Sequence, residues 1–310
     1  MKVKCYKRYR ILIWIVIVLL LFVFISNHVS KETPTFHQPA HDLSFVVGED
    51  MNITWENMKK GADTAAADFD ATVHFAVLDK TKTIEDVLEE SADKGSDAWI
   101  IAPVGAIDED LLSGKKTALF AGARVNSTSP LTYVGCNYKE MGSAVADEII
   151  RHGNYHKNVY VVNEGKVNES IATLLQVLKT ELAKADNGVQ TIGLSDVETV
   201  LDKEKQPVFV ALNPKVLYRM AVKLEHSQTK HPELYGLGNS RELIPYIESG
   251  VITGSVVQDD FSIGYQAVAC AVKKLEHQSC RDIDTIRFSL IDHENMYSKE
   301  HEKLLFPFIR

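Results

Sequence analysis

Several features that mark specialised protein classes are scarce in this sequence of 310 residues. Four cysteines are too few for a fold held by a disulfide framework, and 9 prolines with 17 glycines exclude collagen-like and low-complexity chains. A hydrophobic fraction of 45% is too high for an intrinsically disordered chain. No repeat of about 20 to 50 residues is present, which argues against a solenoid or propeller. We therefore expect ordinary globular domains.

The motifs of common catalysts and cofactors are also missing. There is no phosphate-binding loop G-x-x-x-x-G-K-[ST], no G-x-S-x-G nucleophile elbow and no H-E-x-x-H zinc helix. Gly236 and Gly238 follow a predicted strand, but no third glycine completes a dinucleotide-binding fingerprint. Two pairs of histidines spaced by four residues lack a nearby third ligand. We predict no catalytic residue, no metal site and no cofactor.

One long hydrophobic run is present. Residues 11–25 (ILIWIVIVLLLFVFI) are all apolar. As a helix they extend about 22 Å, short of the roughly 30 Å hydrocarbon core, so residues up to 29 must complete a span. The preceding residues carry five Lys or Arg and no acid, which predicts that they stay in the cytoplasm. We expect a basic cytoplasmic tail at 1–10, a transmembrane signal anchor at 11–29, and an extracytoplasmic remainder at the cell membrane.

A cleaved signal peptide is the alternative, because its apolar core has a similar length. The residues after the run offer no convincing pair of small side chains for cleavage, and no cysteine follows as a bacterial lipoprotein requires. An uncleaved anchor is therefore favoured. Residues 30–42 contain two prolines and no periodicity, which predicts a linker to the folded part.

The part of the chain after the anchor is acidic. Without the five N-terminal cations, 29 Lys and Arg stand against 42 Asp and Glu, a net charge of about −13. Such a surface repels phosphate backbones, so nucleic-acid binding is disfavoured. Cys136, Cys270 and Cys280 are expected outside, and an odd number permits at most one bridge. Cys270 and Cys280 are the closest pair in sequence, but three buried thiols fit equally well.

From Leu43 onward, short β-rich runs alternate with amphipathic helices. Asn137 followed by Glu140 is typical of a helix N-cap. The clearest helix has an apolar stripe formed by Ile171, Leu174, Leu175, Leu178 and Leu182. Repeated strand-helix-strand units predict parallel sheets covered on both faces. Eleven candidate strands are many for one open sheet, so two doubly wound lobes are expected.

Two stretches, GSDAWIIAP at residues 95–103 and GVITGSVVQD at residues 250–259, resemble the type I periplasmic binding proteins, the ribose-binding-protein-like sugar-binding group. Residues 95–103 (GSDAWIIAP) are similar to the family's helix-to-strand turn ending in proline. Residues 250–259 (GVITGSVVQD), with Gly264 following, are similar to its late hinge strand and the next helix. Shorter motifs around Asn52, Asn137 and Asn213 fall in the family's order. The resemblance extends from about Leu43 to Asp292.

The resemblance implies an α/β domain at 43–310 with two doubly wound, Rossmann-like lobes, a hinge and three crossovers. The first lobe would hold residues 43–121 and 259–283, and the second 122–258 and 284–310. A small ligand, in this family usually a monosaccharide, would bind between the lobes and stabilise their closure.

Five ligand-binding positions follow from the resemblance: Asn52, Trp55, Asn213, Asn239 and Gln258. An aromatic face suits the apolar side of a sugar ring, and side-chain amides donate to and accept from hydroxyls. Each position has a structural alternative. The two residues at 52 and 213 could cap helices, Trp55 could be core, Asn239 a turn residue and Gln258 part of the hinge.

The sequence departs from the family at charged positions that usually hold sugars. Gly105 stands where an Asp is common, and Asn168 or Glu169 replaces a usual Arg. Each lost charge-assisted hydrogen bond costs about 1.5 to 3 kcal/mol, so the ligand need not be ribose-like. Lys82 and Arg124 could instead meet a sugar acid or sugar phosphate, or lie on a solvated surface.

These observations predict a non-catalytic, membrane-anchored solute-binding protein for a small polar, sugar-like ligand. A fixed anchor suits sensing with a membrane partner such as a sensor histidine kinase. The alternative is the substrate-binding component of a sugar ABC transporter, working with a permease. An extracellular enzyme on the same lobes is less favoured, because the matched positions have few titratable groups. A Lac-repressor-type regulator would need a DNA-binding arm where this chain has its apolar run.

Overall fold

The computed structural model describes residues 17, 40–48, 55–78, 82–102, 117–125, 131–164, 167–225, 232–238 and 240–305. The chain divides into two compact units, residues 1–39 and 40–310, and the fold below is that of the second. The predicted cytoplasmic tail, the predicted membrane segment apart from residue 17, and nearly all of the linker lie outside the described residues. Within the described ranges, no helix has the length and apolar character needed to cross a membrane.

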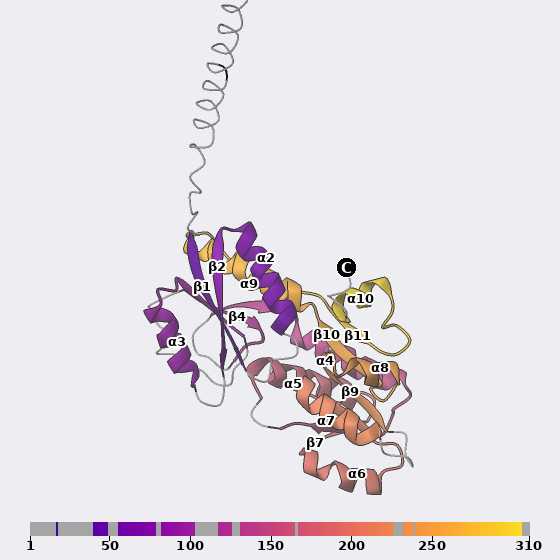
Figure 1. The fold of residues 1–310 in the computed structure, drawn as a ribbon. Helices are drawn as coiled ribbons and strands as arrows, with labels where there is room; N and C mark the ends of the chain where they lie inside the picture. The colour runs from indigo at the N-terminus through magenta and orange to yellow at the C-terminus, as the bar shows by residue number, and fades with distance from the viewer. Residues whose placement is uncertain are drawn as a thin grey trace, which may run out of the picture. The chain divides into compact units, whose positions relative to one another are not determined.

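A five-stranded parallel sheet forms the first lobe, with strand order β2-β1-β3-β4-β5 (Figure 1). Its strands are β1 (His41–Gly48), β2 (Ala71–Leu78), β3 (Ala98–Ile101), β4 (Thr117–Gly122) and β5 (Thr132–Gly135). Strand β1 alternates between two cores, because successive side chains point to opposite faces. Phe45 faces α2 (Trp55–Asp68) and α9 (Asp260–Leu275), whereas Val46 faces α3 (Ile84–Asp93).

Helices α2 and α9 lie side by side although they are far apart in the sequence (Figure 1). Two glycines permit this close approach. A Cβ atom on Gly264 would lie 1.9 Å from the carbonyl oxygen of Met58, and one on Gly61 would lie 1.9 Å from that of Phe261. The late helix α9 is thereby fixed to the first lobe.

The second lobe contains a six-stranded sheet of order β11-β10-β9-β8-β6-β7. Its strands are β6 (Asn158–Val162), β7 (Gly188–Ile192), β8 (Val208–Ala211), β9 (Glu233–Leu237), β10 (Gly254–Gln258) and β11 (Phe288–Ile291). All pairings are parallel except that of β10 with β11. Its helices are α4 (Tyr138–Arg151), α5 (Glu169–Ala183), α6 (Val197–Lys203), α7 (Pro214–Glu225), α8 (Ile244–Glu248) and α10 (Lys299–Leu305), with a 3₁₀ turn at Leu194–Asp196.

Local sequence patterns account for the best-defined helices. Asn137 caps α4 by accepting from the backbone N–H groups of Lys139 and Glu140, as predicted. In α5, Leu174, Leu178 and Leu182 are fully buried, which confirms the predicted apolar stripe.

Three crossovers join the lobes, leading from β5 to α4, from β10 to α9, and from α9 to β11. The predicted α/β arrangement with two parallel-sheet lobes is present. The first lobe extends beyond the implied boundary at 121, because β5 pairs with β4 in register from Leu119 and Thr132 onward. A buried four-residue strand such as β5 suits either sheet, so its pattern alone did not place it.

Candidate ligand-binding site

The carboxyl ends of both sheets meet at the crossovers. Strand β5 ends at Gly135 and leads into α4 of the second lobe, while β10 ends at Gln258 and leads into α9 of the first. Arg241, after β9, lies 3.8 Å from Glu56 in the first turn of α2, so loops of the two lobes come together here. In open α/β sheets, ligands bind outside the carboxyl ends of the strands.

Gln258 makes a contact between two crossovers. Its Nε2 donates to the hydroxyl oxygen of Tyr138, the first residue of α4, at 3.3 Å. Burial raises the pKa of Tyr138 above its ordinary value, so the phenol is neutral at physiological pH. In the described part of the chain no group donates to the amide oxygen of Gln258. That oxygen is available to accept from a ligand hydroxyl.

Asn213 lies between β8 and α7 and is half-buried. Its Oδ1 accepts from the N–H of Val216 at 2.9 Å, so the side chain caps α7. The structural role considered for this residue is therefore present. Capping uses only the oxygen, and Nδ2 still has a donor for a ligand.

Trp55 is the first residue of α2 and is half-buried. Its ring centroid lies 6.3 Å from that of Phe75 in β2, and Phe75 stacks on Phe45 at 5.2 Å. Lys59 Nζ lies 4.4 Å from the Phe75 centroid. Trp55 thus belongs to an aromatic cluster of the first lobe, as the structural alternative proposes, and keeps part of its surface exposed.

Asn52, Asn239 and Gly105 lie outside the described residues. The ligand-binding roles assigned to Asn52 and Asn239 stay predictions.

The two cations considered for an anionic ligand both have carboxylate partners. Lys82 Nζ lies 2.6 Å from Glu90 Oε2, and its hydrogen bond, together with one from Lys94, lowers the pKa of Glu90 to about 2. Arg124 pairs with Asp282 of the third crossover, and its guanidinium lies 4.7 Å from the ring centroid of Tyr133. Local ion pairing gives both cations a structural function within the molecule.

The start of α5 holds the two residues that replace the family's arginine. Asn168 is the N-cap, and its Oδ1 accepts from the N–H of Ile171 at 2.9 Å. Glu169 is exposed in the first turn. The next residue, Ser170, accepts from the backbone N–H of Arg124 at 2.8 Å, so the first turn of α5 contacts the first lobe.

Sequence reasoning missed Tyr138, Glu56 and Arg241. Asn137 indicated a helix start, but no sequence pattern pointed to a contact between Tyr138 and a residue 120 positions later. A pocket of about 330 Å³ lies at the crossovers, lined by Asn137, Glu140 and residues 284–288. It contains none of the predicted ligand residues. The described residues include no group of three or more His, Cys, Asp or Glu side chains placed to hold a metal ion.

This arrangement defines a two-lobed α/β binding protein with polar side chains at the facing carboxyl ends of its sheets. Residues 44–279 match the family model described as periplasmic binding protein domain, and the chain belongs to this family. The type I resemblance of the sequence is confirmed. A search of curated protein sequences finds no match.

Solved structures share the fold at low sequence identity. An ABC transporter solute binding protein from Agrobacterium vitis with bound D-fucose is 15% identical, with a TM-score of 0.75 over 86% of this chain and 100% of that one. A second from the same organism, bound with α-D-tagatopyranose, is 18% identical, with a TM-score of 0.74 over 86% and 99%. A chain of a XylFII-LytSN complex is 14% identical, with a TM-score of 0.70 over 82% and 98%.

Proposed function

We propose that this chain is a non-catalytic solute-binding protein that holds a small, neutral, sugar-like ligand between its lobes. The observation that carries the proposal is the set of amide side chains at the carboxyl ends of β8 and β10. Asn213 keeps a free donor and Gln258 a free acceptor within the described part of the chain, and a hydroxyl group matches both. Ion pairing of Lys82 and Arg124 argues against an anionic ligand. Structural neighbours were solved with D-fucose and α-D-tagatopyranose.

The proposal places the folded domain outside the cytoplasm, anchored in the cell membrane by residues 11–29. The apolar run and its cationic flank support this topology. The Cys270–Cys280 disulfide supports it independently, because structural disulfides persist mainly in oxidising compartments.

The proposed output is closure of the lobes, sensed by a membrane partner such as a sensor histidine kinase. A fixed anchor keeps the domain beside one partner, and a similar fold is known in a complex with a second protein, XylFII with LytSN. Delivery to an ABC permease is the second candidate, favoured by neighbours named as ABC transporter solute binding proteins. Co-purification from membranes in mild detergent separates the two: recovery of a permease instead of a kinase would contradict the sensing role.

Ligand binding is tested by thermal shift on the full chain in detergent with D-fucose, D-arabinose, D-tagatose and D-glucuronate. A neutral sugar at 100 times its dissociation constant should add about 2.7 kcal/mol of stability. The Gln258→Ala variant should lose this shift, while Gln176→Ala, on an exposed position of α5, should keep it. A shift with D-glucuronate alone, or one unaffected by Gln258→Ala, would contradict the proposed site.

A further inference from the structure

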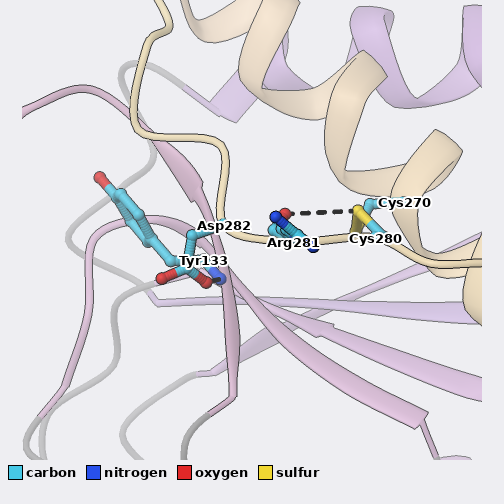
Figure 2. Close-up of a disulfide and its surroundings, with 5 residues drawn as sticks. All are labelled: Tyr133, Cys270, Cys280, Arg281 and Asp282. Carbon is cyan, nitrogen blue, oxygen red and sulfur yellow. Dashed lines mark hydrogen bonds between the residues drawn. A yellow bond between two sulfur atoms is a disulfide. The ribbon is translucent and has the colours of Figure 1, made fainter.

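A disulfide lies at the start of the third crossover, just after α9. It joins Cys270, which is buried in α9, to Cys280 in the segment that follows this helix (Figure 2). The intervening residues 276–279 are exposed. The bond therefore fixes to α9 a segment with little packing of its own.

Directly after Cys280, the chain runs along β5. Asp282 Oδ1 accepts from the backbone N–H of Tyr133 at 2.9 Å (Figure 2), and its other oxygen pairs with Arg124. The N–H of Ile283 donates to the carbonyl of Tyr133 at 2.7 Å, and Gly135 N–H donates to the carbonyl of Ile283 at 2.8 Å. This stretch of the third crossover extends the first lobe's sheet beyond β5.

The N–H of Ile286 still donates to the carbonyl of Gly135, the last residue of β5, at 3.2 Å, and the attachment changes at the next residue. The carbonyl of Arg287 accepts from the N–H of Asp259, on the second crossover, at 3.0 Å. It also accepts from the thiol of Cys136, on the first crossover, at 3.5 Å. Phe288 then begins β11 in the second lobe. All three crossovers meet at Arg287, whereas the stretch from Cys280 to Ile286 is held by the first lobe.

We propose that the Cys270–Cys280 bond is a redox-sensitive hinge staple. It assigns residues 280–286 to the first lobe and confines bending of the third crossover to the backbone around Arg287. Because α9 directly follows the second crossover, the bond also makes the second and third crossovers move as one. Reduction of the bond releases the third crossover and loosens the joint between the lobes.

The redox step requires an external dithiol. Its thiolate attacks the sulfur of Cys280, which lies in a half-buried residue, whereas Cys270 is only 1% exposed. The S–S bond breaks, Cys270 leaves as a thiolate and takes a proton. The second thiol of the reductant then displaces the sulfur of Cys280, which is protonated in turn. Two electrons and two protons pass to the protein, and the reductant closes to a disulfide.

Hydrogen exchange measured by mass spectrometry on the full chain in detergent tests the staple without any ligand. Oxidised protein is compared with dithiothreitol-treated protein and with the Cys270→Ser/Cys280→Ser variant. Amides in residues 131–136 and 282–287 should exchange at least tenfold faster in both. Amides of β6 and β8, in the second lobe, should not change.

The Cys136→Ser variant is the matched control, because it removes a buried thiol at the hinge and leaves the disulfide intact. If the double variant does not fold, reduction of the folded wild-type protein still gives the result. Unchanged exchange in 131–136 and 282–287 would overturn the proposal. So would an equal increase in both lobes, which would show a global loss of stability. Neither result depends on the proposed ligand.

Discussion

Helices begin differently in the two lobes. In the second lobe, α4, α5 and α7 start with Asn137, Asn168 and Asn213, and each uses its side-chain oxygen to cap the helix. In the first lobe, α3 starts with a Thr83–Asp86 capping box and α9 with Asp259. An asparagine that caps through oxygen keeps an N–H₂ donor, whereas a carboxylate only accepts. Asn137 Nδ2 already donates to Glu140 Oε1 at 3.0 Å, so the donors that the second lobe offers after its own strands are those of Asn168, after β6, and Asn213, after β8.

The first lobe offers complementary groups. Trp55 presents part of an aromatic ring, and Glu56 presents an acceptor paired with Arg241 of the other lobe. A ligand that both donates and accepts, with an apolar face, matches the two sides together. The difference between the lobes thus supports a neutral polyol better than a carboxylate, which would face acceptors in the first lobe.

The largest expected effect concerns helix packing. In the Gly264→Ala variant, the new Cβ would lie 1.9 Å from a backbone oxygen of α2, so α2 and α9 must separate. The second lobe has a looser counterpart, where a Cβ on Gly142 of α4 would lie 2.7 Å from the carbonyl oxygen of Leu174. We expect losses of about 3 kcal/mol for Gly264→Ala and about 1 kcal/mol for Gly142→Ala in urea unfolding. Equal losses would show that the two helix pairs are equally close.

Two substitutions at Asn213 separate its role as a helix cap from its proposed role as a hydrogen-bond donor to the ligand. Asn213→Ala should lose about 1 kcal/mol of stability, because α7 loses its cap. Asn213→Asp keeps the capping oxygen and should keep most of the stability, but it removes the donor and should weaken sugar binding about tenfold. Urea unfolding and calorimetry with a sugar found in the thermal-shift screen measure the two effects.

The control comes from the first lobe. Thr83→Ala removes the cap of α3 and should cost a similar stability without changing sugar affinity. If Asn213→Asp binds sugar as well as the wild-type protein does, the amide is only a cap.

The sequence alone predicted the features set by local periodicity and capping. The buried stripe of α5 and the cap at Asn137 depend on neighbours within one or two helical turns, so their patterns are visible in the chain. The implied boundaries placed β5 in the second lobe, whereas it pairs with β4 in the first, because a short apolar strand carries no information about its partner. The contact of Gln258 with Tyr138 depends on how two crossovers pack. The sequence left the pairing of Cys270 with Cys280 undecided for the same reason, since cysteine spacing does not reveal which cysteines pair.

A smaller effect is expected from the ion pair that bridges the lobes. Glu56 and Arg241 are both largely exposed, so their attraction contributes at most about 0.5 kcal/mol. Arg241→Glu should weaken sugar binding about twofold at low salt, because like charges then face each other in the closed form. Adding Glu56→Arg should restore the affinity, and 0.5 M salt should remove the difference. A loss that persists in the double variant would assign Arg241 a direct contact with the ligand.

The smallest expected effect concerns the pH dependence of stability that Glu90 gives to the first lobe. Glu90 lies in the first lobe, and the hydrogen bond from Lys82 is the largest cause of its lowered pKa, about 2 against an ordinary 4.5. Because the folded-state pKa is depressed, this carboxylate stabilises the fold above pH 4.5 and loses that contribution between about pH 4.5 and 2. In Lys82→Met the pKa of Glu90 should rise toward 4.5, and the acid dependence of unfolding should become shallower in this window. A carboxyl NMR titration measures the pKa directly, and an unchanged value would show that Lys94 alone lowers the pKa of Glu90.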